Sequence, residues 1–246
     1  MIAHFSAACN PVPALRWAEN CDKMKIGGIA MRDFPMFTTE YGVASLVLRE
    51  IPYQQTAYVT IRDSQEPEKL LQECVSFSRV CGAEQIFATG HDFLEKYPLY
   101  TALWEMRCCT DNLPDTDAAL FPVQENTLDT WREIYNRKIT KVPAGAWMTE
   151  KASKEMLAGG GGYFVHRNGK LLGIGLVGDG AIDWVAAVEP GAGADVVCAL
   201  NHAIAADMVS LTVASTNKKA VALYEKLGFV KVAELKKWYL VHGTAK

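Results

Sequence analysis

Residues 217–229 contain a tyrosine, Tyr224, whose phenol can donate or accept a hydrogen bond and carries an exchangeable proton. They read Asn-Lys-Lys-Ala-Val-Ala-Leu-Tyr-Glu-Lys-Leu-Gly-Phe, a pattern typical of a short amphipathic helix. Asn217 suits the N-cap, Ala220 permits close packing, and Gly228 suits the left-handed position after the last turn. Tyr224 falls on the apolar face, so periodicity alone favours a core residue over a reactive one.

This segment closely resembles the N-x-x-A-x-x-L-Y-x-K-L-G-F signature near the C-terminus of the GNAT N-acetyltransferase superfamily. β-rich runs at residues 209–213 and 230–241 stand where that family has its flanking strands. A meander of three expected strands before a glycine-containing loop also matches the family order. The resemblance covers roughly residues 120–246, about the size of one such domain. It implies transfer of an acetyl group from acetyl-CoA to an amine.

The resemblance also implies roles for individual residues. Tyr224 would stand beside the cofactor sulfur and act as general acid to the departing CoA thiolate, and Asn217 would contact the cofactor. No metal takes part. The other residues assigned to the cofactor are Ala186, Val188, Gly191, Ala192, Gly193, Ala194 and Ala220.

The glycine-containing loop departs from the family pattern. In the family, V-x-P is followed by an Arg or Gln that opens a glycine-rich turn, where free N–H groups and the helix dipole hold the pyrophosphate of CoA. Here Val188-Glu-Pro190 is present, but residues 191–195, Gly-Ala-Gly-Ala-Asp, follow at once without a basic residue. Asp195 would cap a helix well but repel a diphosphate. The loop is therefore either a shortened pyrophosphate site or a strand-to-helix turn capped by Asp195.

A base for the attacking amine is the remaining requirement of acetyl transfer. Asp183 and Glu189 are candidates near the fourth expected strand, and Asp183 lies in the half of that strand where family members often carry a carboxylate. The alternative for Asp183 is an exposed strand carboxylate without a role. Trp184 either lines the acceptor pocket or, as aromatic residues more often do, packs against a helix.

Other catalytic signatures are absent or misplaced. Residues 173–178, Gly-Ile-Gly-Leu-Val-Gly, match the dinucleotide fingerprint, but a turn and another β-rich run follow them instead of a helix. These glycines are expected to permit close backbone approach within a strand. His166 and His202 are expected at the surface. No HExxH, GxSxG, GxxxxGK[ST] or CxxC motif occurs, so common metal, hydrolase and phosphate-loop sites are not indicated.

Composition excludes further classes of function. A hydrophobic fraction of 50% in 246 residues indicates a globular chain, and the net charge is −3. Ten Lys and Arg accompany fourteen Asp and Glu in residues 1–112, and fifteen accompany fourteen in residues 113–246. Neither half has the basic field expected for binding nucleic acid or an anionic membrane. Seven cysteines without a paired motif, no signal peptide and no spanning stretch predict a cytoplasmic protein with reduced thiols.

The elements of the second half follow from hydrophobic periodicity and turn residues. Helices are expected from residue 126 and over 149–157, then three antiparallel strands with Asn168-Gly169 as the first turn, a helix over 195–208, and two further strands around the helix of Tyr224. The pattern predicts an α/β fold, layered in the α+β manner, with one mixed sheet flanked by helices.

The first half repeats part of this order. Strands over 41–50 and 55–62, a helix over 66–80, a strand over 85–88, a short helix and a strand over 99–108 echo the second half without its opening helices. Residues 111–117 are rich in turn formers and predict a linker. We therefore expect two GNAT-like halves in tandem, a degenerate one over residues 1–112 and an acetyltransferase domain over 113–246.

Two functions are consistent with the sequence. The first is an acetyl-CoA-dependent N-acetyltransferase acting on a small-molecule or peptide amine, as a monomer or homodimer. The second is a GNAT-like module that binds a small ligand or a protein partner without acyl transfer, because its phosphate loop is altered.

Overall fold

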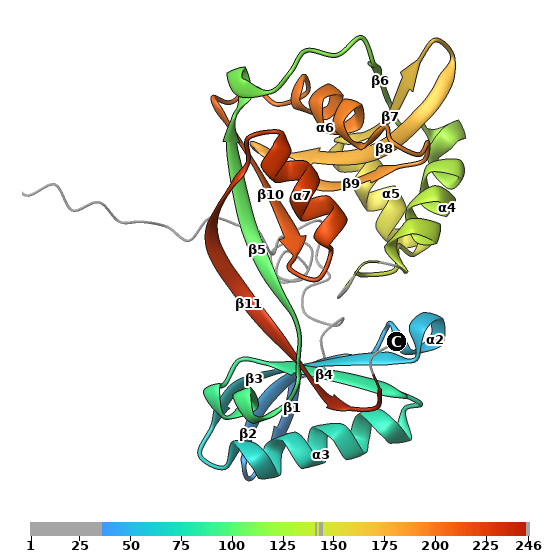
Figure 1. Ribbon diagram of the computed structural model, residues 1–246. Helices are drawn as coiled ribbons and strands as arrows, with labels where there is room; N and C mark the ends of the chain where they lie inside the picture. The colour runs from blue at the N-terminus through green and yellow to red at the C-terminus, as the bar shows by residue number, and fades with distance from the viewer. Residues whose placement is uncertain (1–35, 141, 143–144, 245–246) are drawn as a thin grey trace, which may run out of the picture.

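The computed structural model describes residues 36–140, 142 and 145–244, which fold around one mixed sheet of eleven strands (Figure 1). The strands are β1 (Met36–Thr39), β2 (Gly42–Val47), β3 (Thr56–Ser64), β4 (Gln85–Thr89), β5 (Leu99–Cys109), β6 (Ala119–Pro122), β7 (Gly162–Arg167), β8 (Lys170–Gly178), β9 (Ala181–Ala187), β10 (Met208–Ala214) and β11 (Val230–His242). The helices are α2 (Ile51–Gln54), α3 (Pro67–Val80), α4 (Leu128–Ile139), α5 (Glu150–Gly159), α6 (Gly193–Asn201) and α7 (Lys218–Lys226), with short 3₁₀ turns η1 (Asp92–Lys96), η2 (Thr110–Asn112) and η3 (Glu125–Thr127).

The spatial order of the strands, β1-β2-β3-β4-β11-β5-β10-β9-β8-β7-β6, is symmetrical about the central pair β11–β5. Next to that pair lie β4 and β10, each parallel to the strand on its outer side, and beyond them the antiparallel meanders β1–β3 and β7–β9. The two halves therefore repeat one topology, as their element order predicts. Only β6 has no counterpart among the described strands.

The last long strand of each half is inserted next to the other half. β5 pairs antiparallel with β10 over seven residues, and β11 pairs antiparallel with both β4 and β5. Figure 1 shows β5 and β11 running side by side from the upper to the lower part of the molecule. The sheet is consequently continuous through both halves, and the division between residues 112 and 113 stays a prediction.

Turn residues set the register of the meander in the second half. Asn168 and Gly169 have φ values of 51° and 75°, so both occupy the left-handed region that a two-residue hairpin turn requires. The hairpin expected from this dipeptide is confirmed, since β7 and β8 pair on either side of it. After α7, Gly228 has φ 91°, and the next N–H, that of Phe229, donates to the carbonyl of Tyr224 at 2.9 Å. The predicted glycine terminus of this helix is also confirmed.

Glycines in β8 allow α6 to lie directly on the sheet. A Cβ at Gly173 would stand 2.5 Å from the carbonyl oxygen of Ala186 and 2.7 Å from Val196, and one at Gly175 would collide with Leu200. This agrees with the expected close approach within a strand. A dinucleotide-binding turn is excluded because the segment is the interior of β8.

Helix α6 is shorter than the sequence pattern predicts. It begins at Gly193 and ends at Asn201, whereas the helical periodicity of the apolar residues continues to Met208. Met208 instead opens β10, and Ile204 packs against the core from the intervening loop. A longer helix would leave no chain to turn back, because β10 must return beside β9 in the parallel direction.

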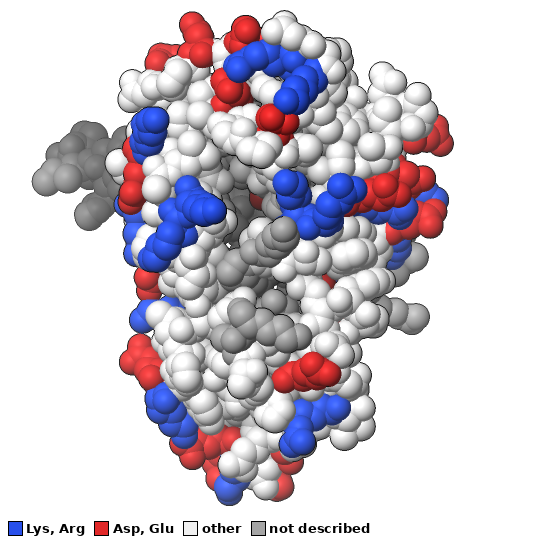
Figure 2. Space-filling model, turned by 45° about the vertical axis from the view of Figure 1, so that its right-hand side comes forward, with Lys and Arg blue, Asp and Glu red and all other residues white. Residues whose placement is uncertain are grey.

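Helices cover both faces of the sheet in the second half. A cluster of buried hydrophobic side chains lies between the sheet and each pair of helices. α4 and α5 enclose a core with Trp131, Met156 and Ile174, while α6 and α7 enclose another with Val196, Leu200, Val209 and other residues. In the first half, α3 packs against β2 and β3. On the face drawn in Figure 2, basic and acidic side chains are interspersed, and the surface is hollowed where the halves meet.

Candidate functional site

Strands β9 and β10 separate soon after they meet. They pair only through Ser210 with Ala181 and Leu211 with Ile182, although each strand is seven residues long. The rest of β9 is only half-buried, despite its position inside the sheet. A wedge-shaped opening therefore lies between the carboxyl ends of two parallel strands, where backbone groups can bind an extended ligand.

The equivalent strands of the first half are closed. β3 and β4 pair through all five residues of β4, from Gln85 to Thr89. The helix that follows β3 starts at Pro67, which lacks an N–H, and carries Glu68 in its first turn. The first half therefore has neither the opening nor a helix N-terminus suited to an anion.

At the wide end of the opening, α6 begins with several unused backbone donors. Val188 N–H donates to the carbonyl of Leu172 at 2.8 Å, and Ala192 N–H donates to that of Glu189 at 3.3 Å. Within the described part of the chain, no acceptor is found for the N–H groups of Gly191, Gly193 and Ala194. Of the sequence-predicted amides, Val188 and Ala192 are thus already engaged, and the other three remain available to a ligand.

Asp195 does not cap α6, which corrects the alternative in which this carboxylate closes the helix. The helix has no side-chain cap. Instead Asp195 accepts from Arg167 at 2.6 and 3.2 Å and from the Thr116 hydroxyl at 3.3 Å, while Arg167 Nε lies 2.5 Å from Asp117 Oδ1. The basic residue missing from the loop is therefore supplied near α6 by the end of β7, although two carboxylates share it.

The register of the β7–β8 hairpin could have predicted that Arg167 lies near the start of α6. The β7–β8 turn follows Arg167 directly, and β8 runs antiparallel to β9, with Gly173 opposite Ala187. The turn and the end of β9 must therefore lie at the same edge of the sheet. The sequence prediction covered only residues inside the loop.

Asp183 lies at the apex of the opening, one residue beyond the last pair of β9 with β10. It occupies a β-bulge, since Leu176 faces Trp184 while Val177 faces Ile182. Its carboxylate lies over the neighbouring strand, because a Cβ at Gly178 would stand 2.5 Å from Asp183 Oδ2.

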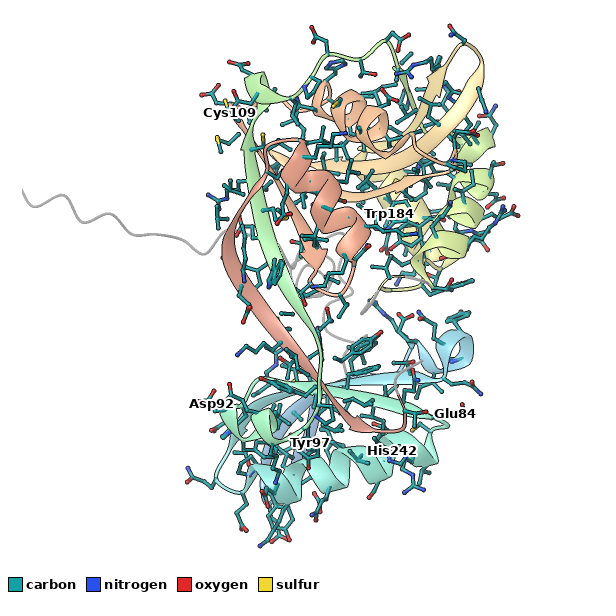
Figure 3. All side chains as sticks on the ribbon, viewed as in Figure 1. Glu84, Asp92, Tyr97, Cys109, Trp184 and His242 are labelled. Atoms are coloured by element: carbon teal, nitrogen blue, oxygen red, sulfur yellow. The ribbon has the colours of Figure 1, made fainter. Side chains whose placement is uncertain are left out.

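Trp184 packs on the α4 side of β9 (Figure 3). Its ring centroid is 4.4 Å from that of Tyr135 and 6.1 Å from that of Trp131. Helix packing, the more frequent of its two expected roles, is what the structure shows.

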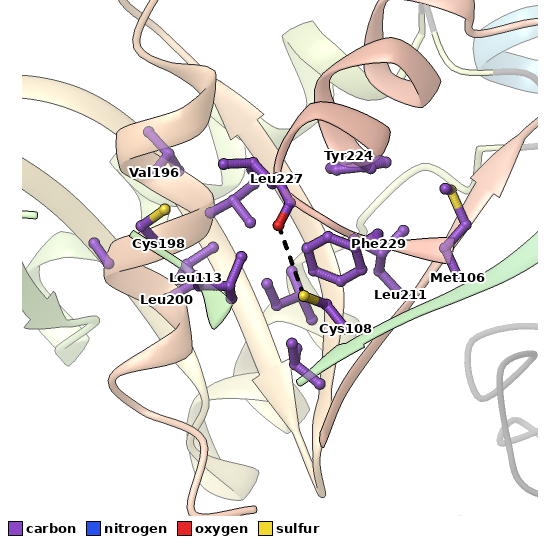
Figure 4. Close-up of a cluster of buried hydrophobic side chains, with 14 of the residues drawn as sticks. Met106, Cys108, Leu113, Val196, Cys198, Leu200, Leu211, Tyr224, Leu227 and Phe229 are labelled. Carbon is purple, nitrogen blue, oxygen red and sulfur yellow. Dashed lines mark hydrogen bonds between the residues drawn. The ribbon is translucent and has the colours of Figure 1, made fainter. Parts of the chain in front are cut away.

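Tyr224 is buried on the α7 side of the opening. Its ring lies 5.8 Å from that of Phe229 at one side of the core cluster (Figure 4), and its hydroxyl has no hydrogen-bond partner among the described residues. Burial raises the pKa of Tyr224 to about 12, so the phenol is neutral at physiological pH. A Cβ at Gly193 would stand 2.9 Å from Leu223, which shows that the start of α6 lies against the helix carrying Tyr224.

Asn217 and Ala220 act together at the start of α7. Asn217 Oδ1 accepts from the N–H of Ala220 at 3.3 Å, which confirms the predicted N-cap. Its amide nitrogen is not used by the cap. Ala220 is half-buried against the core cluster of α6 and α7. The structure thus brings the start of α6, at the open end of β9, against Leu223 of α7, while the Asp183 carboxylate points elsewhere.

A cavity of about 860 Å³ lies where the halves meet, next to Asn217. Its remaining walls come from α2, β3, β4, β5 and the loop after α4. Aromatic side chains in the lining are Tyr53, Tyr58, Phe87 and Tyr100. Amide and hydroxyl side chains in the lining are Gln54, Gln55, Thr56, Gln85, Thr140, Thr216 and Asn217. Sequence reasoning missed these first-half residues because they lie far along the chain from the signature.

Side chains of the first half bind the loop before α5 through hydrogen bonds and ring stacking. The buried carboxylate of Glu50 accepts from the Trp147 N–H at 3.0 Å and from Gln54 Nε2 at 3.2 Å, and Gln54 also donates to the carbonyl of Gly145 at 3.3 Å. Tyr53 stacks on Trp147 with ring centroids 4.8 Å apart. The pKa of Glu50 is raised above its ordinary value by burial, and the hydrogen bond from the Trp147 N–H offsets part of this rise.

Comparison with solved structures identifies the architecture. At 13% identity, a conserved protein of unknown function from Staphylococcus epidermidis aligns over 85% of this chain and 93% of its own, with a TM-score of 0.56. GCN5-related N-acetyltransferases from Kribbella flavida and Anabaena variabilis both give 0.52, at 14% and 13% identity, over 85% and 84% of this chain and 55% and 58% of theirs. The chain has the GNAT fold. No protein-family model and no curated protein matches its sequence.

No group of three or more His, Cys, Asp or Glu among the described residues could hold a metal ion. Within the same residues, no helix is long and apolar enough to cross a membrane. His202 is exposed as expected, whereas His166 is only half-exposed, because Phe121 lies edge-on to its ring at 5.3 Å.

Proposed function

We propose that the chain is an acetyl-CoA-dependent N-acetyltransferase whose second half, residues 113–246, holds the cofactor. The observation that carries this proposal is the opening between β9 and β10, which is flanked by unused N–H groups of α6 and by Tyr224 of α7. The first half, residues 1–112, acts as a degenerate repeat, because its own parallel strands are closed. We further propose a cytoplasmic monomer or homodimer that acts on small-molecule or peptide amines.

The cofactor would lie along the opening with its diphosphate at the start of α6. Gly191, Gly193 and Ala194 supply N–H donors there, and the helix dipole favours negative charge. Ala186 of β9 and the carbonyl of Val188, which follows that strand, provide backbone partners for the pantetheine arm, since the Val188 N–H already donates to Leu172. Asn217 and Ala220 border the thioester from α7. No metal ion is required.

The reaction exchanges one acyl bond for another. The amine nitrogen attacks the thioester carbon, a C–N bond forms and the C–S bond breaks. The amine loses a proton to a base, for which the sequence predicts Asp183; its carboxylate, which lies over Gly178, would have to turn into the opening to accept this proton. The departing thiolate takes a proton from the neutral phenol of Tyr224. The products are an N-acetyl amide and CoA.

A second candidate function rests on the charges around α6. Asp117 and Asp195 surround the single guanidinium of Arg167, so the local balance disfavours a diphosphate. A GNAT-fold module that binds a small ligand or a protein partner without acyl transfer would tolerate this arrangement.

Thermal unfolding with acetyl-CoA, CoA and adenosine separates the two functions. An N-acetyltransferase should gain about 2.7 kcal/mol of stability at a hundredfold excess of acetyl-CoA over its Kd. Adenosine, which lacks the diphosphate and thioester, is the matched ligand control. Stabilisation by acetyl-CoA without turnover of any amine favours the binding module, and no stabilisation rejects the acetyltransferase.

A further inference from the structure

The cavity between the halves borders the proposed thioester site. Thr216 and Asn217, which follow β10, line it directly, and Asn217 also caps α7. An amine held in this cavity would lie beside Asn217, the N-cap of the helix that carries Tyr224. The cavity is thus suited to the acceptor, and most of its described wall belongs to the first half.

The lining of this cavity is uncharged among the residues that the structure describes. The described walls offer no carboxylate for a polycationic amine and no guanidinium or ammonium for an amino acid carboxylate. Moving a charged group from water into a site without a counter-charge is costly. The cavity therefore favours acceptors that carry a single amino group and no other charge.

Aromatic rings, two of which carry hydroxyls without a partner among the described residues, line the same cavity. Tyr100 stacks on Phe87 with centroids 4.2 Å apart and planes 25° apart, and Tyr58 also stacks on Phe87, with centroids 5.6 Å apart. The hydroxyls of Tyr53 and Tyr100 have no hydrogen-bond partner in the described part of the chain. The lining amides already hold other partners, such as Gln54 with Gly145 and Gln85 with the Thr244 carbonyl. An aromatic surface beside two unused tyrosine hydroxyls suits a ring compound with hydrogen-bonding groups.

We infer, on the basis of the proposed function, that the acceptor is a monoamine of an uncharged ring compound rich in hydroxyl or amide groups, bound between the halves. Amino sugars are the simplest members of this class. The ring would stack on Tyr100, the half-buried member of the Phe87–Tyr100 pair, because Phe87 itself is buried. Its hydroxyls would bond to the Tyr100 hydroxyl and to Gln85 Oε1, since Gln85 Nε2 already donates to the Thr244 carbonyl. The amine would then face Asn217 and the thioester carbon.

Binding and turnover of three probe amines test the inference. Glucosamine carries one amine on a hydroxyl-rich ring, spermidine is a polycation, and glutamate carries carboxylates. Calorimetry without cofactor, followed by CoA release with saturating acetyl-CoA, should favour glucosamine by about tenfold or more in both Kd and kcat/KM. Equal or weaker binding of glucosamine overturns the inference. Because calorimetry omits the cofactor, a failure of acetyl-CoA binding is recognised separately as failure of the proposed function.

Charge introduced into the cavity locates the acceptor. Gln85→Glu should tighten spermidine binding by about tenfold, since a partly buried carboxylate now faces the ammonium groups. Gln72→Glu is the matched control, because Gln72 is exposed on α3 outside the cavity. Tyr100→Phe keeps the stacked ring and should weaken glucosamine binding without changing the Kd of acetyl-CoA. If Gln85→Glu and Gln72→Glu behave alike, the acceptor does not bind in this cavity.

Discussion

Arg167 donates two hydrogen bonds to the carboxylate of Asp195, with nitrogen–oxygen distances of 2.6 and 3.2 Å. The pair joins the end of β7 to the first turn of α6. It therefore determines how much negative charge a diphosphate would meet at this helix N-terminus. Because both side chains are about one-third exposed, solvent and salt weaken the pair.

Replacing Asp195 by Asn should tighten CoA binding. The substitution removes a carboxylate beside the unused N–H groups of α6 and leaves Arg167 in place, so we expect a Kd lower by about three- to tenfold. Stability should change by less than about 1 kcal/mol, because the pair is partly exposed. Calorimetry with CoA at low and high salt measures the effect, and Asp115→Asn, an exposed neighbour, is the control. An unchanged Kd would place the diphosphate away from α6.

Replacing Tyr224 by Phe should slow acetyl transfer without weakening cofactor binding. The ring and its packing on Phe229 are kept, and only the proton donor is lost, so kcat should fall by about 10²-fold or more. Since the pKa of Tyr224 is about 12, its phenol stays protonated and produces no alkaline loss of wild-type activity below about pH 10. Tyr163→Phe on β7 is the control. Equal kcat values for Tyr224→Phe and wild type would exclude Tyr224 from the reaction.

Replacing Glu50 by Gln should change how stability depends on pH. Burial raises the pKa of Glu50, so the folded chain binds this proton more tightly than the unfolded chain, in which Glu titrates near about 4.3. The wild-type free energy of unfolding therefore falls as the pH rises through that value toward the folded pKa. The introduced amide cannot titrate, yet its carbonyl can still accept from Trp147.

Urea unfolding between acidic and neutral pH checks this expectation. The slope of stability against pH should flatten in Glu50→Gln and persist in Glu225→Gln, whose carboxylate is exposed on α7. Glu50→Ala, which leaves the Trp147 N–H without its acceptor, should lose about 1–3 kcal/mol at neutral pH. A wild-type slope in Glu50→Gln would show that this carboxylate does not titrate differently on folding.

Replacing Gly175 by Ala should strain the contact between β8 and α6. The added methyl collides with Leu200, so we expect a loss of about 1–3 kcal/mol in the free energy of unfolding. The loss should shrink in the background of Leu200→Ala. At Gly159, no atom lies within 4 Å of an added Cβ, and Gly159→Ala should be neutral or slightly stabilising in chemical denaturation. Equal stabilities of the two alanine variants would contradict the packing argument.

Local sequence patterns were sufficient for most of the elements. The Asn168-Gly169 turn and the Asn217 cap act within a few residues, so their effects can be read directly from the chain. The sequence predicts too long a helix α6, because the apolar periodicity continues through Ile204 to Met208. The helix ends earlier because the chain must return beside β9. The spacing of apolar residues along the chain carries no information about where the next strand must pair.

The site was harder to predict because its parts meet through tertiary contacts. The signature indicated Tyr224 and Asn217, yet Arg167 comes from a different hairpin and the cavity walls come from the first half. The partnership of Glu50 with Trp147 likewise joins residues that no local pattern connects. Pairing of β5 with β10 and of β11 with β4 depends on the complete sheet, so the element order alone could not reveal it.

The position of β11 has a consequence for biosynthesis. Val230–His242 is the last of the described strands to leave the ribosome, yet its Tyr239 pairs with Ala88 of β4. Until that strand arrives, β4 presents an unpaired edge, and the earlier-made half cannot complete its hydrogen-bonded ladder. Folding therefore requires closure of a very long loop, which slows the reaction and prolongs exposure to aggregation. Nascent chains stalled before residue 230 should depend on chaperones for solubility.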